Sequence, residues 1–257
     1  MIQKFQKGWR PIFVLLLLFI GWEFTARITE IPTWFLPTPS QIFNELINGW
    51  SNVSVHLTST IQLIFLGFVS GVTVGLLTAF ILHNIPLLKE SLYPLLILSQ
   101  NIPIIVLAPL LVIWFGFGLL PKLIVITLVC FFPITISAMD GFRQVAPDLF
   151  HYMQMAGATK RQLFWKLEFP FALPSIFSGL KISATYSVMG AVISEWLGSE
   201  NGIGVYMTLS SSSFRTDRVF VAIFLIMLLS LLFFIMINWL ERFIIRWKAE
   251  GKNRGAS

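Results

Sequence analysis

The chain has 257 residues, of which 56% are hydrophobic and only 12% are charged. A soluble domain carries roughly a quarter charged residues, so this composition excludes an ordinary soluble fold and predicts an all-α integral membrane protein. A membrane-spanning helix needs about 20 apolar residues. The length therefore accommodates five or six spanning helices, which we expect to form a single transmembrane domain over residues 1–257.

The net charge of +6 would suit a nucleic-acid ligand, but the positions of the basic residues indicate membrane topology instead. Apolar runs lie at approximately 11–28, 57–82, 92–115, 120–140, 174–197 and 219–240. If residues 1–10 are cytoplasmic, most of the 18 Lys and Arg residues fall in cytoplasmic segments, including residues 143–174 and the basic tail 241–257. This bias predicts that both termini are cytoplasmic, and no nucleic-acid partner is expected.

Proline residues after the first apolar run are expected to interrupt helical structure there. Thr38 or Ser40 is expected to cap a short amphipathic helix that begins near Gln41. In the second run, Gly67, Gly71 and Gly75 recur every four residues and share one helix face. This spacing predicts close approach of another helix rather than a substrate contact.

The third run contains Pro94, Pro103 and Pro109, which are expected to kink a helix and free backbone carbonyls. Gln100 and Asn101 lie just before Pro103, so polar groups gather at a bend. Bent helices with freed carbonyls line the pathways of transporters, which makes these residues pathway candidates. The alternative is that they satisfy one another between helices.

Two acidic residues lie in or near apolar runs, where an ionisable group is costly and is a functional hypothesis by default. Ser194 and Glu195, in the last turns of the fifth run, are candidates for a translocation pathway or gate; helix-end or packing roles are the alternative. For Glu23 a structural role is favoured.

The Gly- and Ser-rich segment that follows Glu195, up to residue 218, is expected to be irregular and partly re-entrant.

No catalytic constellation, metal-ligand spacing or phosphate-binding loop occurs in the sequence. His56, His83 and His151 fall in different segments, and Cys130 has no second cysteine. We therefore expect no catalytic residues, no metal and no cofactor on this chain. If transport consumes ATP, the ATP and Mg²⁺ must be bound by a separate ATPase subunit.

Residues 143–174, called here the interspan segment, form a charged amphipathic stretch between apolar runs. Pro147 and Asp148 suit the first turn of a helix through LFHYMQMA, which Gly157 would end in a left-handed conformation. Thr159 would cap a second helix, KRQLFWKLEF, ended by Pro170. A cytoplasmic protein docking on this helix–turn–helix would bury four apolar residues: Phe150, Tyr152, Met153 and Leu163.

The interspan segment resembles the "EAA" signature, E-A-A-x3-G-x9-I-x-L-P, of permease subunits of bacterial ABC importers. Gly157 and Pro170 match it outright. Leu167 and Phe169 replace its isoleucine and leucine, and HYM stands at the E-A-A positions. The segments LPTPSQIF, NIPIIVLAPLLVIWFGFG, FFPITISAMDGF and VISEWLGSENGIGVYM resemble the nitrate/sulfonate/taurine group, which includes carriers of pyrimidine precursors of thiamine. The resemblance covers nearly the whole chain.

The resemblance implies the type I importer permease fold in the bacterial cytoplasmic membrane: six helices, with two copies of the chain enclosing a pathway. The implied partners are a dimer of ATP-binding subunits, an extracytoplasmic substrate-binding protein, a second copy of the chain and membrane lipid. It also implies that the interspan segment couples to the ATPase. The residues assigned to this coupling are Phe150, Tyr152, Met153, Ala156, Gly157, Ala158, Thr159, Leu167, Pro170 and Pro174.

The substrate is less determined by the residues. A dedicated anion path calls for a basic side chain within the membrane, and Lys181, near the inner end of its span, comes closest. Glu195 and the many aromatic residues favour a hydroxymethylpyrimidine-like solute over a sulfonate, taurine or nitrate-like anion. Three other classes stay open: an ion-coupled secondary transporter, a polytopic membrane enzyme and a purely structural membrane scaffold.

Overall fold

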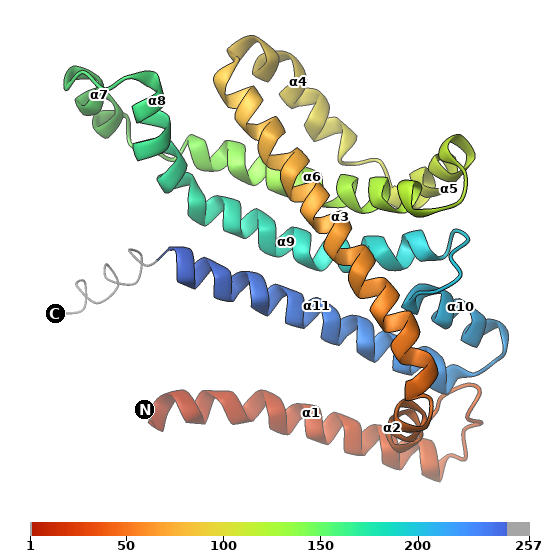
Figure 1. Ribbon diagram of the computed structural model, residues 1–257. Coiled ribbons are helices and arrows are strands. Elements are labelled where there is room, and N and C mark those ends of the chain that lie inside the picture. The colour runs from red at the N-terminus through yellow and green to blue at the C-terminus, as the bar shows by residue number, and fades with distance from the viewer. Residues whose placement is uncertain (1, 246–257) are drawn as a thin grey trace. The chain divides into compact units, whose positions relative to one another are not determined.

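The computed structural model describes residues 2–245, and the described residues form helices without a β-strand (Figure 1). The bounds are α1 Ile2–Ile28, α2 Pro39–Asn48, α3 Trp50–Asn84, α4 Pro86–Ser99, α5 Ile104–Phe115, α6 Leu119–Phe142, α7 Pro147–Met155, α8 Lys160–Leu163, the π-helical turn η1 Phe164–Glu168, α9 Phe169–Glu195, α10 Ile203–Ser212 and α11 Thr216–Ile244. The predicted basic tail lies outside the described residues from 246 onward, and before that point α11 remains helical to Ile244.

Five of the described helical segments are long and apolar enough to cross a membrane. They are Trp9–Ile28, Trp50–Asn84, Leu119–Phe142, Lys160–Glu195 and Thr216–Ile244. The pair α4 and α5 adds a sixth crossing if the two helices count as one broken span. The expected all-α architecture with about six spans is thereby confirmed.

The third predicted run is not one helix, because α4 and α5 meet at an angle of 102°. The bend falls at Pro103, the residue before α5, whose backbone is extended at φ −63° and ψ 118°. A proline has no N–H for a helical bond and forces the residue before it out of the helical region. Pro94 and Pro109 lie inside α4 and α5. The sharp break therefore belongs to the middle proline.

The described residues form two compact units, each described here by itself. The first comprises Met1–Ser59 with Glu200–Ile226, and the second comprises Thr60–Ser199 with the chain from Met227. The expectation of a single transmembrane domain stays a prediction.

The first unit contains the predicted short helix, α2, whose N-cap is Thr38. The Thr38 hydroxyl accepts from the Gln41 amide, and the Gln41 side chain accepts from the Thr38 amide, which makes a capping box. Glu23 of α1 accepts from the Ser40 amide at 3.0 Å and the Ser40 hydroxyl at 2.8 Å. Glu23 therefore anchors α2 to α1, the structural role that the sequence favoured.

The Gly- and Ser-rich segment after Glu195 is helical at α10, where the sequence predicted an irregular loop. Ile203 and Tyr206 of α10 are buried in the core of the first unit, against Val53, Val221 and Leu225. Helix stability in proteins comes mostly from packing one face of the helix. Burial of these residues therefore outweighs the poor helix propensity of the serines and glycines.

The second unit is built on α6 and α9, which run antiparallel and side by side (Figure 1). Small residues allow their close approach: a Cβ on Gly179 would lie 2.8 Å from the Pro133 carbonyl oxygen. The predicted packing role of the α3 glycines is confirmed. Gly67, Gly71 and Gly75 lie against Ile126, Cys130 and Ile134 of α6, respectively.

The second helix of the interspan segment does not end at Pro170, contrary to the sequence prediction. Lys160–Glu195 is one continuous helical segment in which Pro170 lies in the first turn of α9. The π turn η1 precedes it, and the Phe169 amide donates to the Phe164 carbonyl, five residues back. Because a π turn already leaves carbonyls without their usual helical partners, it lets the helix pass a proline that has no N–H. Pro174 lies inside α9.

Candidate functional site

The interspan segment contains a compact helical hairpin, α7 and α8, that extends beyond the paired helices α6 and α9 (Figure 1). Pro147 stands at the first helical position of α7, and Asp148 lies in the first turn, as the sequence predicted. An aspartate there complements the positive end of the helix dipole. The start of α7 is therefore encoded by adjacent residues.

The end of α7 is a Schellman motif centred on Gly157. The Gly157 amide donates to the Gln154 carbonyl at 2.9 Å, and the Ala158 amide donates to the Met153 carbonyl at 3.0 Å. Ala156 is the C-cap residue, and Gly157 has a φ of +82°. This left-handed conformation is the one predicted for it, and glycine adopts it without steric penalty.

The next helix begins at a capping box. The Thr159 amide donates to Gln162 Oε1 at 2.8 Å, and the Gln162 amide donates to Thr159 Oγ1 at 3.3 Å. Thr159 therefore caps α8 as the sequence predicted. Together the Schellman motif and the capping box hold the turn between α7 and α8 without any distant contact.

Exposure separates the predicted docking residues into two groups. Tyr152 is 67% exposed, while Phe150 and Met153 are half-buried; Met155, which sequence reasoning did not single out, is 82% exposed. Leu163 is only 4% exposed, so the prediction that a partner would bury it is wrong: the chain itself buries it. Leu167 is buried in the same way. Residues 163 and 167 are one helical turn apart, and their shared face points inward.

Within the second unit, the hairpin is joined to α3 and α6 by an aromatic cluster around Phe164. The Phe164 ring lies 5.2 Å from Phe80 and 5.5 Å from Phe142, measured between ring centroids. Beside it, His83 Nε2 lies 2.9 Å from Glu168 Oε2, which ties the end of α3 to η1. Sequence reasoning missed this connection, because no local pattern relates residues that are 85 positions apart.

The two sets of pathway candidates occupy different surroundings. The Glu195 carboxylate, 1% exposed, accepts a hydrogen bond from the Thr60 hydroxyl at 2.7 Å. Ser194 is also buried, and its hydroxyl donates to the Ala191 carbonyl of its own helix. Both residues therefore make structural contacts at the end of α9. Sequence reasoning missed Thr60, whose hydroxyl carries no signal in an apolar run.

Gln100, Asn101 and Pro103 lie in the break between α4 and α5, and all three are exposed. Asn101 Nδ2 donates to the carbonyls of Ile97 at 3.0 Å and Leu98 at 3.3 Å. The Asn101 side chain thus adds hydrogen bonds to backbone carbonyls in the last turn of α4. The bend exposes polar groups at this end of α4, as a pathway role requires, while Asn101 serves its own helix.

The basic residue of α9 has an acidic partner on α11. Lys181 Nζ lies 2.9 Å from Glu241 Oε2 of α11. Lys181, the basic residue that sequence reasoning placed nearest the membrane interior, therefore has an acidic partner within the chain.

Among the residues that the structure describes, no group of three or more His, Cys, Asp or Glu side chains could hold a metal ion.

Comparison with known proteins gives one family and several relatives of similar length. A family model described as "Binding-protein-dependent transport system inner membrane component" matches residues 71–246. The formylaminopyrimidine transport permease protein ThiX of Halalkalibacterium halodurans is 36% identical over 250 residues, covering 97% of this chain and 100% of that protein. The riboflavin transport system permease protein RibX of Chloroflexus aurantiacus is 30% identical and covers 92% of this chain and 89% of that protein.

Other relatives are named for other cargo. The taurine transport system permease protein TauC of Escherichia coli is 28% identical over 92% of this chain and 88% of that protein. Among solved structures, a chain of the MetNI methionine ABC transporter, crystallised in inward-facing conformations, matches with a TM-score of 0.62 at 19% identity. The match covers 77% of this chain and 95% of that one, and it bears on the fold alone.

Proposed function

This chain belongs to the family of binding-protein-dependent transport system inner membrane components, and we propose from that premise that its cargo is a pyrimidine-like precursor of thiamine. Membership makes the chain a permease subunit of an ABC importer in the bacterial inner membrane. The fold expected from the sequence, that of the type I importer permease, is confirmed. Its assignment to the nitrate/sulfonate/taurine group is confirmed as well.

The observation that carries the cargo proposal is the 36% identity to ThiX along the full length of that protein. RibX, whose name also specifies a heteroaromatic cargo, is 30% identical. A sulfonate-like anion, the cargo in the name of TauC, is the competing substrate.

Uptake measurements distinguish the two cargo classes. The complete transporter, with its ATPase and binding protein, is tested in membrane vesicles for ATP-dependent uptake of labelled formylaminopyrimidine and of labelled taurine. We expect saturable uptake of the pyrimidine that excess taurine does not inhibit. Uptake of taurine alone would refute the proposed cargo while leaving the family assignment intact.

The mechanism proposed for this permease uses a separate ATPase dimer, which holds ATP and Mg²⁺, and a binding protein that delivers the cargo to the outer face. Two copies of the chain enclose the pathway, and their termini lie in the cytoplasm. Nucleotide binds the two ATPase arrangements with different affinity, and this difference shifts the permease between outward and inward openings. The ATPase docks on the α7–α8 hairpin.

Two features of the hairpin support ATPase docking there. Tyr152 and Met155 offer exposed apolar surface at the end of the molecule that the basic residues assign to the cytoplasm. The turn at Gly157 is held by local hydrogen bonds, so the surface is ordered before a partner binds. Preorganised surfaces lose less conformational entropy on binding.

A matched pair of glycine variants tests the docking role. A Cβ at Gly157 or at Gly21 would meet no atom within 4 Å, but only Gly157 has a positive φ. Gly157→Val is therefore expected to disturb the turn by backbone strain, whereas Gly21→Val is not. Co-purification of the ATPase and ATP-driven uptake should fall in the Gly157 variant and stay normal in the control. Normal values in both variants would contradict the docking assignment.

A further inference from the structure

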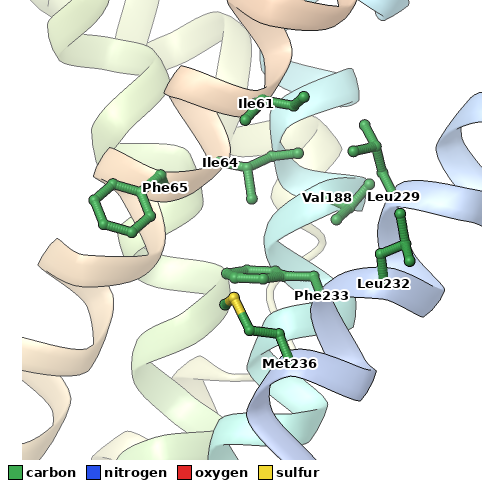
Figure 2. A pocket seen from close by; sticks show the side chains of 8 residues that line it. All are labelled: Ile61, Ile64, Phe65, Val188, Leu229, Leu232, Phe233 and Met236. Carbon is green, nitrogen blue, oxygen red and sulfur yellow. The ribbon is translucent and has the colours of Figure 1, made fainter.

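An apolar recess lies in the second unit between three spanning helices, α3, α9 and α11 (Figure 2). Its volume is about 230 Å³. Its main walls are Ile64, Phe65, Val188, Leu232, Phe233 and Met236. Figure 2 shows Phe233 reaching from α11 across the recess, with Met236 beside it. A cavity of roughly 150 Å³ holds a benzene molecule, so this recess is large enough for several methylene groups.

The recess is open at its edge. Phe65 of α3 is 58% exposed and Leu232 of α11 is 54% exposed. Because all three walls are helices apolar enough to cross a membrane, the medium at this edge is the hydrocarbon of the bilayer. A flexible hydrocarbon chain can therefore enter from the side without crossing a polar region.

A polar feature stands at one end of the recess. Lys181 lies seven residues before Val188 on the same face of α9, a separation of roughly 10 Å along the helix. Its ion pair with Glu241 is partly accessible, with side-chain exposures of 21% and 20%. A positive and a negative group thus lie beyond one end of the recess, along α9 and α11. Together they complement a lipid headgroup that carries both a negative and a positive charge.

The distance between the recess and the ion pair agrees with the thickness of one leaflet of the bilayer. Leu232 precedes Glu241 by about 13 Å along α11. One leaflet of hydrocarbon is about 15 Å deep. Trp239, 65% exposed, stacks on Phe243 at 6.2 Å in the same turns as Glu241. Exposed tryptophan at a helix end is typical of the headgroup layer, so the ion pair stands at the membrane surface and the recess lies in the inner half of the bilayer.

We propose that the recess holds one acyl chain of a zwitterionic phospholipid, whose phosphate contacts Lys181 and whose ammonium group contacts Glu241. The acyl chain fills the space between α3, α9 and α11 and holds these helices at a set spacing. The headgroup fixes the lipid at the ion pair. A phosphatidylethanolamine has the required charges, whereas a phosphatidylglycerol lacks the ammonium group.

Two neighbouring leucines of α11 provide a matched test. Leu232 lines the recess and is 54% exposed, whereas Leu231 does not line it and is 55% exposed. The transporter complex, purified in detergent, is titrated with phosphatidylethanolamine or with phosphatidylglycerol of the same chains, and bound lipid is counted by native mass spectrometry. Leu232→Trp, which fills the recess, is expected to weaken phosphatidylethanolamine binding about tenfold, the effect of roughly two buried methylene groups. Leu231→Trp should bind as the unchanged protein does, and both variants should unfold at similar temperatures.

The headgroup contacts are tested by Glu241→Gln, which is expected to remove the preference for phosphatidylethanolamine over phosphatidylglycerol. Equal binding by the two tryptophan variants would overturn the proposal, and so would equal binding of the two lipids by the unchanged protein.

A second copy of the chain is the rival occupant. Cys130 is buried, so Leu232→Cys introduces one accessible thiol. Efficient crosslinking of two Leu232→Cys chains through this thiol in membranes would assign the recess to a subunit interface and overturn the lipid assignment.

Discussion

The two ends of the α7–α8 hairpin are built differently. Its tip, residues 147–159, is shaped by hydrogen bonds between residues a few positions apart, and Tyr152 and Met155 lie exposed on it. Its root, η1 with Phe142 and His83, is held by buried rings and by a hydrogen bond between the distant side chains of His83 and Glu168. Local hydrogen bonds hold the shape of the tip. Its apolar side chains therefore do not have to pack within the chain, and they can contact a partner. Under the proposed docking of the ATPase on the tip, the packed root would transmit movement of the tip to α9.

The largest effect is expected when the root loses its central ring. Phe164 is 6% exposed and contacts Phe80 and Phe142. Phe164→Ala should lower the free energy of unfolding by about 3–5 kcal/mol, because a buried cavity replaces the ring. Thermal unfolding in detergent measures this loss. A loss below about 1 kcal/mol would mean that the root is not a packed core.

The hydrogen bond between His83 and Glu168 at the root should contribute less. Glu168→Ala leaves His83 without its partner and is expected to lower stability by about 1–3 kcal/mol, because a partly buried polar group becomes unsatisfied. Glu168→Gln keeps a hydrogen-bonding side chain and should lose less. A double-mutant cycle with His83→Ala isolates the pair, and strict additivity of the two single losses would contradict a direct interaction.

A cap at the tip should contribute about 1 kcal/mol. Thr159→Ala removes the acceptor for the Gln162 amide, and loss of an N-cap side chain typically costs this amount. Thr159→Ser retains the hydroxyl and is the control. Amide hydrogen exchange over residues 159–163 should rise in the alanine variant and remain unchanged in the serine variant; equal exchange in all three proteins would contradict the cap.

The smallest effect on stability, combined with a loss of function, is expected at the exposed face of the tip. Tyr152 is 67% exposed, and Tyr152→Ala should change the free energy of unfolding by less than about 0.5 kcal/mol. Binding of the ATPase, measured by co-purification and by titration, should nevertheless weaken. If Tyr152→Ala bound the ATPase normally, the division between a docking tip and a structural root would fail.

The same division separates what sequence reasoning predicted from what it missed. Pro147, Asp148, Gly157 and Thr159 act within one or two turns of their own positions, so their roles in starting and ending helices were predicted correctly. The inward burial of Leu163 was missed, because an apolar residue on a short amphipathic helix suits a core and a docking surface equally well. The continuation of the helix past Pro170 was also missed. A π turn has no clear signature in neighbouring residues, and here the buried Phe164 and Leu167 stabilise it.

The sequence by itself determined the membrane class, the number of spans and the interspan hairpin, because hydropathy and helix capping are properties of neighbouring residues. The resemblance of its motifs led to the importer family. Only the tertiary structure decided where the third span breaks, that α10 is helical, and which polar and charged side chains are paired. The pairs Thr60–Glu195, His83–Glu168 and Lys181–Glu241 join different helices. Their formation depends on how the helices pack, and that arrangement is not encoded in any local stretch of the chain.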